Sequence, residues 1–242
     1  MARLKFKPSD PPQAPARGVK AATFKLLLDT AMEAIQCSGH VLSVAEVAVR
    51  ARVSRATAYR YFPSRGALIT AVIGNSLGPV REFSCAAAGG RERVRELFAQ
   101  TFPRFKEFEP QMRAALQLSL EQWAQQRAGA LDEELYRRGH RVRILNRAIA
   151  PLAATLPPAL HERLHKALSV IYGIESHVIL KDIWGASQPD IERTVLWMAD
   201  ALIDAALREA AAEQTHARRA TGVRQPLRRN GPVREAAPAK PR

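Results

Sequence analysis

Apolar residues recur every three or four positions along most of the chain, as they do on one face of a helix. The first such helix is predicted over residues 19–37, with an apolar face of Phe24, Leu27, Leu28, Ala31 and Ile35. Further helical patterns cover residues 91–108, 110–127, 130–154, 158–184 and 189–213. Few stretches alternate as strands do, so the pattern predicts an all-α protein.

Three serines divide the stretch LSVAEVAVRARVSRATAYRYFPSRGAL, residues 42–68, into short helices. Ser43 and Glu46 have the spacing of a capping box, in which each residue satisfies an amide group of the other. Ser54 is placed to cap a second helix that Pro63 ends, and Ser64 caps a third. Two short helices joined by a tight turn predict a helix-turn-helix that enters the major groove of DNA.

The second helix of this motif has an inward side and a polar outward side. Four-residue spacing places the outward groups on neighbouring faces, where they could contact base edges: Arg55, Ala56, Tyr59 and Arg60. The flanking residues are expected to contact phosphates: Ser43, Thr57, Tyr61 and Arg65. A short, merely solvated amphipathic helix is the alternative, and two tyrosines on the exposed side argue against it.

The excess positive charge is concentrated in particular segments. The formal net charge is +14. Residues 43–66 hold five arginines against one glutamate, and both ends of the chain are also basic, whereas residues 67–212 are nearly neutral. This distribution favours a polyanionic partner such as double-stranded DNA over a generally arginine-rich composition.

The run from Ser43 to Leu68 resembles the DNA-binding segment of the TetR family of transcriptional regulators, through V-S-R-A-T-x-Y-R-Y-F followed by P-S-R-x-A-L. The resemblance extends over Phe24 to Ile73 and implies the base-facing and phosphate-facing positions named above. Three residues depart from the family pattern. Arg52 replaces a turn glycine and would cost ~1 kcal/mol if its backbone is left-handed. Ala58 replaces a leucine, and Gly66 replaces a helix former.

The resemblance also implies an N-terminal helix-turn-helix domain followed by a C-terminal helical domain for ligand binding and dimerisation. A two-fold interface is predicted on the last two long helices, through Val170, Ile171, Ile174, Val178, Leu196, Ala199, Ile203 and Leu207. A pocket for a small, largely apolar effector is predicted among Phe102, Phe105, Met112, Leu116, Trp123, His140 and His177, although each of these also suits an ordinary core.

One short motif indicates a different chemistry. Residues 161–165 read H-E-R-L-H, which matches the helical zinc signature with Glu162 as the base. Arg163 occupies a position that zinc proteases keep uncharged, and the extended signature is absent because Leu168 and Ile171 stand where Gly and His are needed. A zinc hydrolase is therefore a remote alternative, and the chain is not expected to be an enzyme or to need a metal or other cofactor.

Composition limits the remaining classes. Two cysteines without C-x-x-C spacing argue for a reducing, cytoplasmic setting, and neither a membrane span nor a signal peptide is expected. The predicted organisation is a disordered basic arm over residues 1–18, the DNA-binding domain over 19–66, the effector and dimerisation domain over 67–213, and a disordered basic tail over 214–242. We therefore expect a homodimeric repressor that an effector releases from a palindromic operator. The alternative is a non-regulatory nucleoid or RNA-binding protein.

Overall fold

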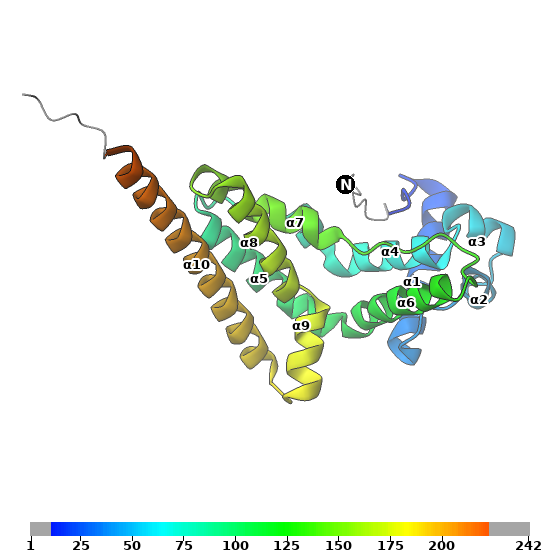
Figure 1. The fold of residues 1–242 in the computed structure, drawn as a ribbon. Coiled ribbons are helices and arrows are strands. Elements are labelled where there is room, and N and C mark those ends of the chain that lie inside the picture. Colours follow the sequence, from blue (N-terminus) through cyan, green and yellow to red (C-terminus); the bar gives the residue numbers. More distant parts are fainter. Residues whose placement is uncertain (1–10, 223–242) are drawn as a thin grey trace, which may run out of the picture.

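The computed structural model describes the backbone of residues 11–222 and the side chains of residues 11–216, and its elements are helices (Figure 1). The predicted all-α class is confirmed. In chain order the elements are α1 (Gly18–Ser38), α2 (Val44–Arg50), α3 (Arg55–Tyr61), α4 (Arg65–Leu77), η1 (Gly78–Glu82), α5 (Gly90–Glu107), α6 (Glu109–Arg127), α7 (His140–Ile149), η2 (Ala150–Ala154), α8 (Pro158–Ile171), α9 (Ile174–Val178), the π-helical segment η3 (Ile179–Ile183) and α10 (Gln188–Gly222).

The first four helices begin and end where local signals predict. Gly39 adopts φ 72° after α1, and its amide donates to the Ile35 carbonyl oxygen. Ser43 caps α2 through the predicted capping box, and Ser54 and Ser64 accept hydrogen bonds from amides in the first turns of α3 and α4. These side chains satisfy amide groups that a short helix would otherwise leave without partners.

The turn between α2 and α3 contains Arg52, which has φ 54°. The Arg52 amide donates to the Val49 carbonyl oxygen over 3.1 Å, and the next amide, of Val53, donates to the Ala48 carbonyl oxygen over 2.9 Å. Arg52 is therefore left-handed, which is the condition under which its side chain was expected to be costly. Because a side chain in this region is strained, the turn carries a local cost that a glycine would not.

Helix α4 connects the first three helices to the rest of the molecule. It is buried over most of its length and packs against α1 and α6. Beyond it, α5, α7, α8 and α10 form the larger helical part, in which α10 contacts both α5 and α8 (Figure 1). Arg91 and Arg95 of α5 bind Asp200 of α10, which holds this pair of helices in register.

The predicted helix over residues 130–154 is wrong for its first half. Helix α6 ends at Arg127, Gly129 adopts φ 67°, and α7 begins only at His140. We call residues 128–139 the strap, because this non-helical segment returns from the end of α6 alongside α4 to reach α7 (Figure 1). Strap residues contact α4 and α6, and these contacts outweigh helix propensity.

The predicted helix over residues 158–184 is interrupted at Tyr172 and Gly173, between α8 and α9. The Tyr172 hydroxyl lies 2.8 Å from the Thr101 hydroxyl in the core. A Cβ at Gly173 would lie 2.5 Å from both an Arg141 nitrogen and a Glu175 oxygen, so a larger residue there would displace the ends of these two side chains.

The structure describes only part of the two predicted tails. Residues 1–10 and 223–242 lie outside the described part of the chain, so the disorder predicted for them is not tested. The last helix was expected to end near Glu213, but α10 continues to Gly222.

Candidate nucleic-acid interface and effector cavity

Helix α3 presents to solvent the four side chains that were predicted to face bases. Arg55, Ala56, Tyr59 and Arg60 are all exposed, and Tyr59 retains 45% of its accessible surface. On the opposite side, Ala58 is fully buried and Phe62, which follows the helix, is 1% exposed. The outward face therefore offers two guanidinium groups and a phenol on a helix whose other face is packed.

Packing from α1 holds this short helix in place. Seven residues form only a marginal helix on their own in water, so tertiary contacts must supply most of its stability. The Phe62 ring lies 4.9 Å from the Phe24 ring of α1, and the Tyr61 ring meets Phe24 edge-on at 6.1 Å. The Arg60 guanidinium lies 5.5 Å from the centre of the Tyr61 ring. A rigid, outward-facing helix of this kind can be placed in a groove without further ordering.

Two of the predicted phosphate-facing residues, Thr57 and Tyr61, are half-buried at the edges of α3. The Thr57 hydroxyl accepts a hydrogen bond from the Ser54 hydroxyl over 2.8 Å, so it belongs to the cap of the helix. Tyr61 packs its ring inward, as described above. Their contacts with phosphates remain predictions.

For Ser43 the capping role is seen, and the predicted phosphate contact stays a prediction. Its hydroxyl and its amide both donate to the Glu46 carboxylate, over 2.7 and 2.8 Å, and its hydroxyl oxygen accepts from the Glu46 amide. These hydrogen bonds from Ser43 lower the pKa of Glu46. In this arrangement Ser43 has no donor left for a phosphate, and its role is to cap α2.

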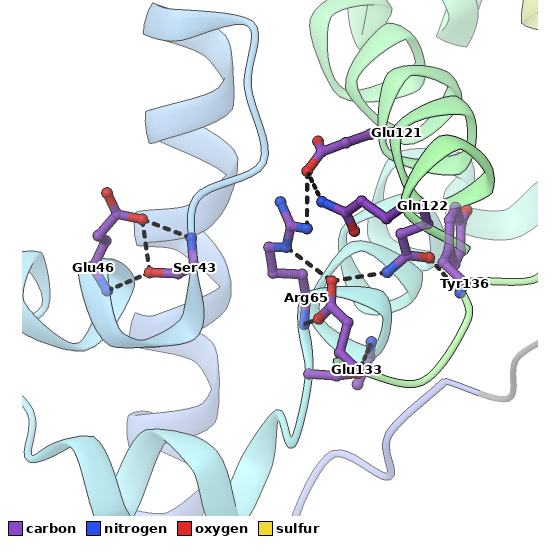
Figure 2. A network of polar contacts seen from close by, with 10 residues as sticks. Ser43, Glu46, Arg65, Glu121, Gln122, Glu133 and Tyr136 are labelled. Carbon is purple, nitrogen blue, oxygen red and sulfur yellow. Dashed lines mark hydrogen bonds and ion pairs between the residues drawn. The ribbon is translucent and has the colours of Figure 1, made fainter. Parts of the chain in front are cut away.

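Arg65 is also engaged by other groups (Figure 2). Its Nε donates to Glu133 Oε1 over 2.9 Å, and its Nη2 donates to Glu121 Oε1 over 3.0 Å. Its backbone amide donates to Glu133 Oε2 over 3.1 Å. Burial by itself would lower the pKa of Arg65, but the two carboxylates outweigh it and the pKa is raised. In this arrangement the Arg65 side chain joins α4 to α6 and the strap, and its contact with a phosphate stays a prediction.

A cavity lies in the larger helical part, between α4, α5, α6, the strap, α7 and the break that precedes α9. Its interior measures about 70 Å³, and about 520 Å³ with its opening to solvent. Three of the predicted pocket residues line it: Phe105, Met112 and His140. Ile73, Leu77 and Ile144 add to a mostly apolar wall of the kind that small-molecule sites use.

The other predicted pocket residues do not line this cavity. Trp123 is 62% exposed, Phe102 is 1% exposed within a cluster of aromatic rings, and Leu116 packs against the core. His177 is 1% exposed, with Nε2 3.4 Å from Glu109 Oε2. Burial lowers the pKa of His177 and outweighs the attraction of Glu109. Their apolar character, or for His177 its place among apolar residues, selected these positions, and neither property separates a cavity wall from a packed core.

Sequence reasoning missed four polar residues of the cavity, three of which lie in the strap or at the α8–α9 break, both of which were expected to be helical. Tyr136, Arg138, Arg141 and Tyr172 all line the cavity. Arg141 Nη2 donates to both Glu175 carboxylate oxygens, over 2.7 and 2.6 Å, and Arg138 binds the same carboxylate. Burial alone would raise the pKa of Glu175, but Arg141 and Arg138 outweigh burial and lower it. Gly139 lies shortly after Tyr136, and Gly173 directly follows Tyr172. These glycines were the available signal that the helices are interrupted there.

The predicted interface residues do not form one exposed stripe on α8 and α10. Ile171, Ile174, Ala199 and Ile203 are buried within the chain itself, and only Val170 is largely exposed, at 71%. An apolar groove does lie on these two helices, and it includes only Val170 and Ile171 of the predicted residues. It is lined by Ala167, Val170, Ile171, Trp197, Met198, Ala201 and Leu202. Trp197 is 70% exposed there. Residues 191–203 of α10 include more apolar side chains than one helix face can hold. This excess was the signal that α10 has a second apolar face.

The histidines of the zinc-like motif contact backbone oxygens. His161 Nε2 donates to the Ile149 carbonyl oxygen over 3.2 Å, and His165 Nε2 donates to the Val142 carbonyl oxygen over 2.9 Å. The Glu162 carboxylate lies 2.9 Å from the Lys166 ammonium group. The motif thus joins α8 to α7, and within residues 11–216 no group of three or more His, Cys, Asp or Glu side chains is placed to hold a metal ion.

No helix in the part of the chain that the structure describes combines the length and apolar character needed to span a bilayer.

Two comparisons with known proteins agree with this geometry, one of the sequence and one of the fold. Residues 27–72 match the family described as bacterial regulatory proteins, tetR family. The fold is similar to the crystal structure of a tetR-family transcriptional regulator from Streptomyces coelicolor, with a TM-score of 0.56 and 18% sequence identity over 85% of this chain and 90% of that one. No curated protein matches the chain.

Proposed function

We propose, on the premise that the chain belongs to the TetR family of DNA-binding transcriptional regulators, that it is a homodimeric repressor released from its operator by a small, largely apolar effector. The observation that carries this proposal is the outward face of α3. Arg55 and Arg60 are exposed there on a helix that Phe24 and Phe62 hold from behind. Arg55 is the group that we expect to donate two hydrogen bonds to a guanine edge.

A second copy of the chain would pack on the groove of α8 and α10. Trp197 and Val170 leave a large apolar area in water there, and two-fold pairing of the same surface would remove it from solvent. The dimer would place two copies of α3 in successive major grooves about 34–36 Å apart. The expected operator is therefore roughly palindromic.

The effector would occupy the cavity beneath α4. Ile73 and Leu77 of α4 line it, and the same helix begins directly after the DNA-binding helices, at Arg65. A ligand that binds better when α4 is shifted would favour a spacing of the two α3 helices that does not fit the operator. The mostly apolar wall supports an apolar effector of modest size.

Selection of bound fragments from the source genome would test the function and identify the operator. Fragments that share a palindrome would support it. On that operator Arg55→Ala should cost ~1–3 kcal/mol and relax the preference for one base pair. Thr155→Ala is a matched control, because Thr155 lies in the turn after η2 and takes no part in the proposed interface. Equal losses on operator and random duplex would show that Arg55 does not read sequence.

The same measurements separate this proposal from a non-regulatory nucleoid or RNA-binding protein. Such a protein would bind random DNA and RNA as tightly as any selected fragment. Light scattering coupled to gel filtration should give twice the mass of one chain, and a monomer at micromolar concentration would contradict the dimer.

A further inference from the structure

Arg65 is the first residue of α4 and follows the DNA-binding helices directly, yet it is bound to groups that lie far along the chain. Its guanidinium contacts Glu121 near the end of α6 and Glu133 of the strap. The side chain of Arg65 is 23% exposed, that of Glu133 is 17% exposed and that of Glu121 is 41% exposed. These three side chains, which we call the Arg65 clamp, carry one positive and two negative charges.

The Arg65 clamp places a net negative charge beside helices that should approach a polyanion. Phosphates would repel the two carboxylates and attract the guanidinium. Both kinds of partner accept hydrogen bonds from a guanidinium in the same way, so they compete for it. Moving the guanidinium outward would leave Glu121 in contact with water, because this carboxylate is already 41% exposed.

Glu133 would keep other hydrogen bonds if the guanidinium left. Its Oε2 accepts from the backbone amide of Arg65, and its Oε1 accepts from Gln122 Nε2 over 2.8 Å. The amide and Gln122 therefore leave the carboxylate satisfied, and a carboxylate at the start of α4 also suits the positive end of the helix dipole. If the guanidinium moved from the two carboxylates to a DNA phosphate, no buried charge would be left without a hydrogen-bond partner. We therefore expect this exchange to be energetically accessible.

The Arg65 clamp is continuous with the effector cavity. Gln122 is fully buried, and its Oε1 accepts from the Tyr136 amide over 2.6 Å. Tyr136 lines the cavity. A Cβ at Gly66 would lie 3.4 Å from the Tyr136 Cβ, which is van der Waals contact, so the strap packs directly on the first turn of α4.

We infer that Arg65 is shared between two sites: Glu121 and Glu133 hold its guanidinium in the arrangement described here, and a backbone phosphate of double-stranded DNA takes it on the operator. The clamp lowers DNA affinity, and displacement of Tyr136 by a ligand changes how firmly Glu133 holds Arg65. This inference rests on the proposed function, because it assigns a regulatory device to the same DNA-binding unit.

The first test compares two charge-neutralising variants on the strap. Glu133→Gln weakens the clamp, whereas Glu134→Gln makes the same charge change at an exposed neighbour. A partly exposed ion pair is worth up to ~1 kcal/mol, so Glu133→Gln should raise affinity for operator and random duplexes roughly three- to fivefold. Glu134→Gln should change it less than about twofold, because exposed charges are screened. Equal effects of the two variants would overturn the inference.

The second test is a double-mutant cycle. Arg65→Gln should reduce the slope of log affinity against log salt concentration by about 0.9, the contribution of one phosphate. In this background Glu133→Gln should no longer raise affinity, since there is no guanidinium left to release. An unchanged salt slope, or a persistent effect of Glu133→Gln, would show that Arg65 is only a structural link.

A third measurement covers the case in which Arg65→Gln does not fold. Glu121→Gln keeps Arg65 and should raise affinity in the same direction as Glu133→Gln, and failure to do so would contradict the clamp. These results also distinguish the two proposals. If the wild-type chain binds DNA without sequence preference, the proposed function is rejected. If it binds a specific sequence but Glu133→Gln and Glu134→Gln change the affinity equally, only the clamp is rejected.

Discussion

The helices before residue 78 and the helices after residue 89 are held at their ends by different means. Serine side chains cap α2, α3 and α4, each through a bond to an amide three residues ahead. Helices α5 to α9 have no side-chain hydrogen bond at their first residues. Helix α1 has no such bond either, and Ser187 caps α10 through the Asp190 amide. The contrast therefore holds between α2–α4, whose first residues are set by local sequence, and α5–α9 in the second part of the molecule, whose first residues depend on contacts between distant segments.

In the proposed function this difference would serve two separate needs. A recognition surface must be rigid before DNA arrives, and local caps with a small aromatic core supply that rigidity. An effector site must respond to a ligand, and ends held by tertiary contacts can shift when those contacts change. The strap and the α8–α9 break are the two places where the second part uses such ends, and both line the cavity.

The largest expected effect is on the aromatic core of the first region. Phe62→Ala removes a ring that is 1% exposed and lies 4.9 Å from the Phe24 ring. It should lower the free energy of unfolding by about 3–5 kcal/mol in urea titration. Tyr59→Ala, on the exposed side of the same motif, should change stability by less than about 1 kcal/mol yet weaken operator binding. Similar stability losses for both would mean that α3 is not oriented as described.

The next effect distinguishes the two faces of α10. Trp197→Ala should weaken the proposed dimer by about 2 kcal/mol or more, seen as a shift of mass toward one chain on dilution. Ile203→Ala, at a fully buried position of the same helix, should instead lower the free energy of unfolding. A dimer that withstands Trp197→Ala would remove the α8–α10 groove from the interface.

A smaller effect is expected at the cap of α2. Ser43→Ala should lower the free energy of unfolding by ~1 kcal/mol, whereas Ser84→Ala in an exposed loop should change it by less than about 0.5 kcal/mol. The pKa of Glu46 is lowered from its ordinary value of 4.5 by the bonds from Ser43. Its contribution is therefore complete above pH 4.5 and is lost as pH falls below that value. The difference between wild type and Ser43→Ala should narrow in acid, and a gap that stays constant to pH 3 would contradict the charged cap.

The smallest effect concerns the strained turn. Arg52→Gly should relieve the left-handed backbone and raise the free energy of unfolding by up to about 1 kcal/mol. Arg50→Gly, two residues earlier and within α2, should lower it instead. Thermal unfolding of the two variants measures whether each one raises or lowers the free energy of unfolding. A lower value for Arg52→Gly would show that the Arg52 side chain stabilises the fold by more than the backbone strain costs.

Sequence alone determined the all-α class, the four N-terminal helices and the outward face of α3. These features depend on neighbours within about four residues, through caps, glycines and helical periodicity, so a linear pattern contains them. Three cavity residues, Phe105, Met112 and His140, were also found, because the apolar pattern there was part of a true wall.

Only the tertiary structure decided the strap, the break at Gly173, the exposed groove of α10 and the partners of Arg65. Each depends on which residues meet across more than 30 positions of chain: Arg65 with Glu121 and Glu133, Arg141 with Glu175, and Gly66 with Tyr136. A helical pattern states that a face is apolar, but it does not state which neighbour covers it. Packing chose among those neighbours, and the same packing placed Arg65, a residue expected to bind phosphate, against the carboxylates of Glu121 and Glu133.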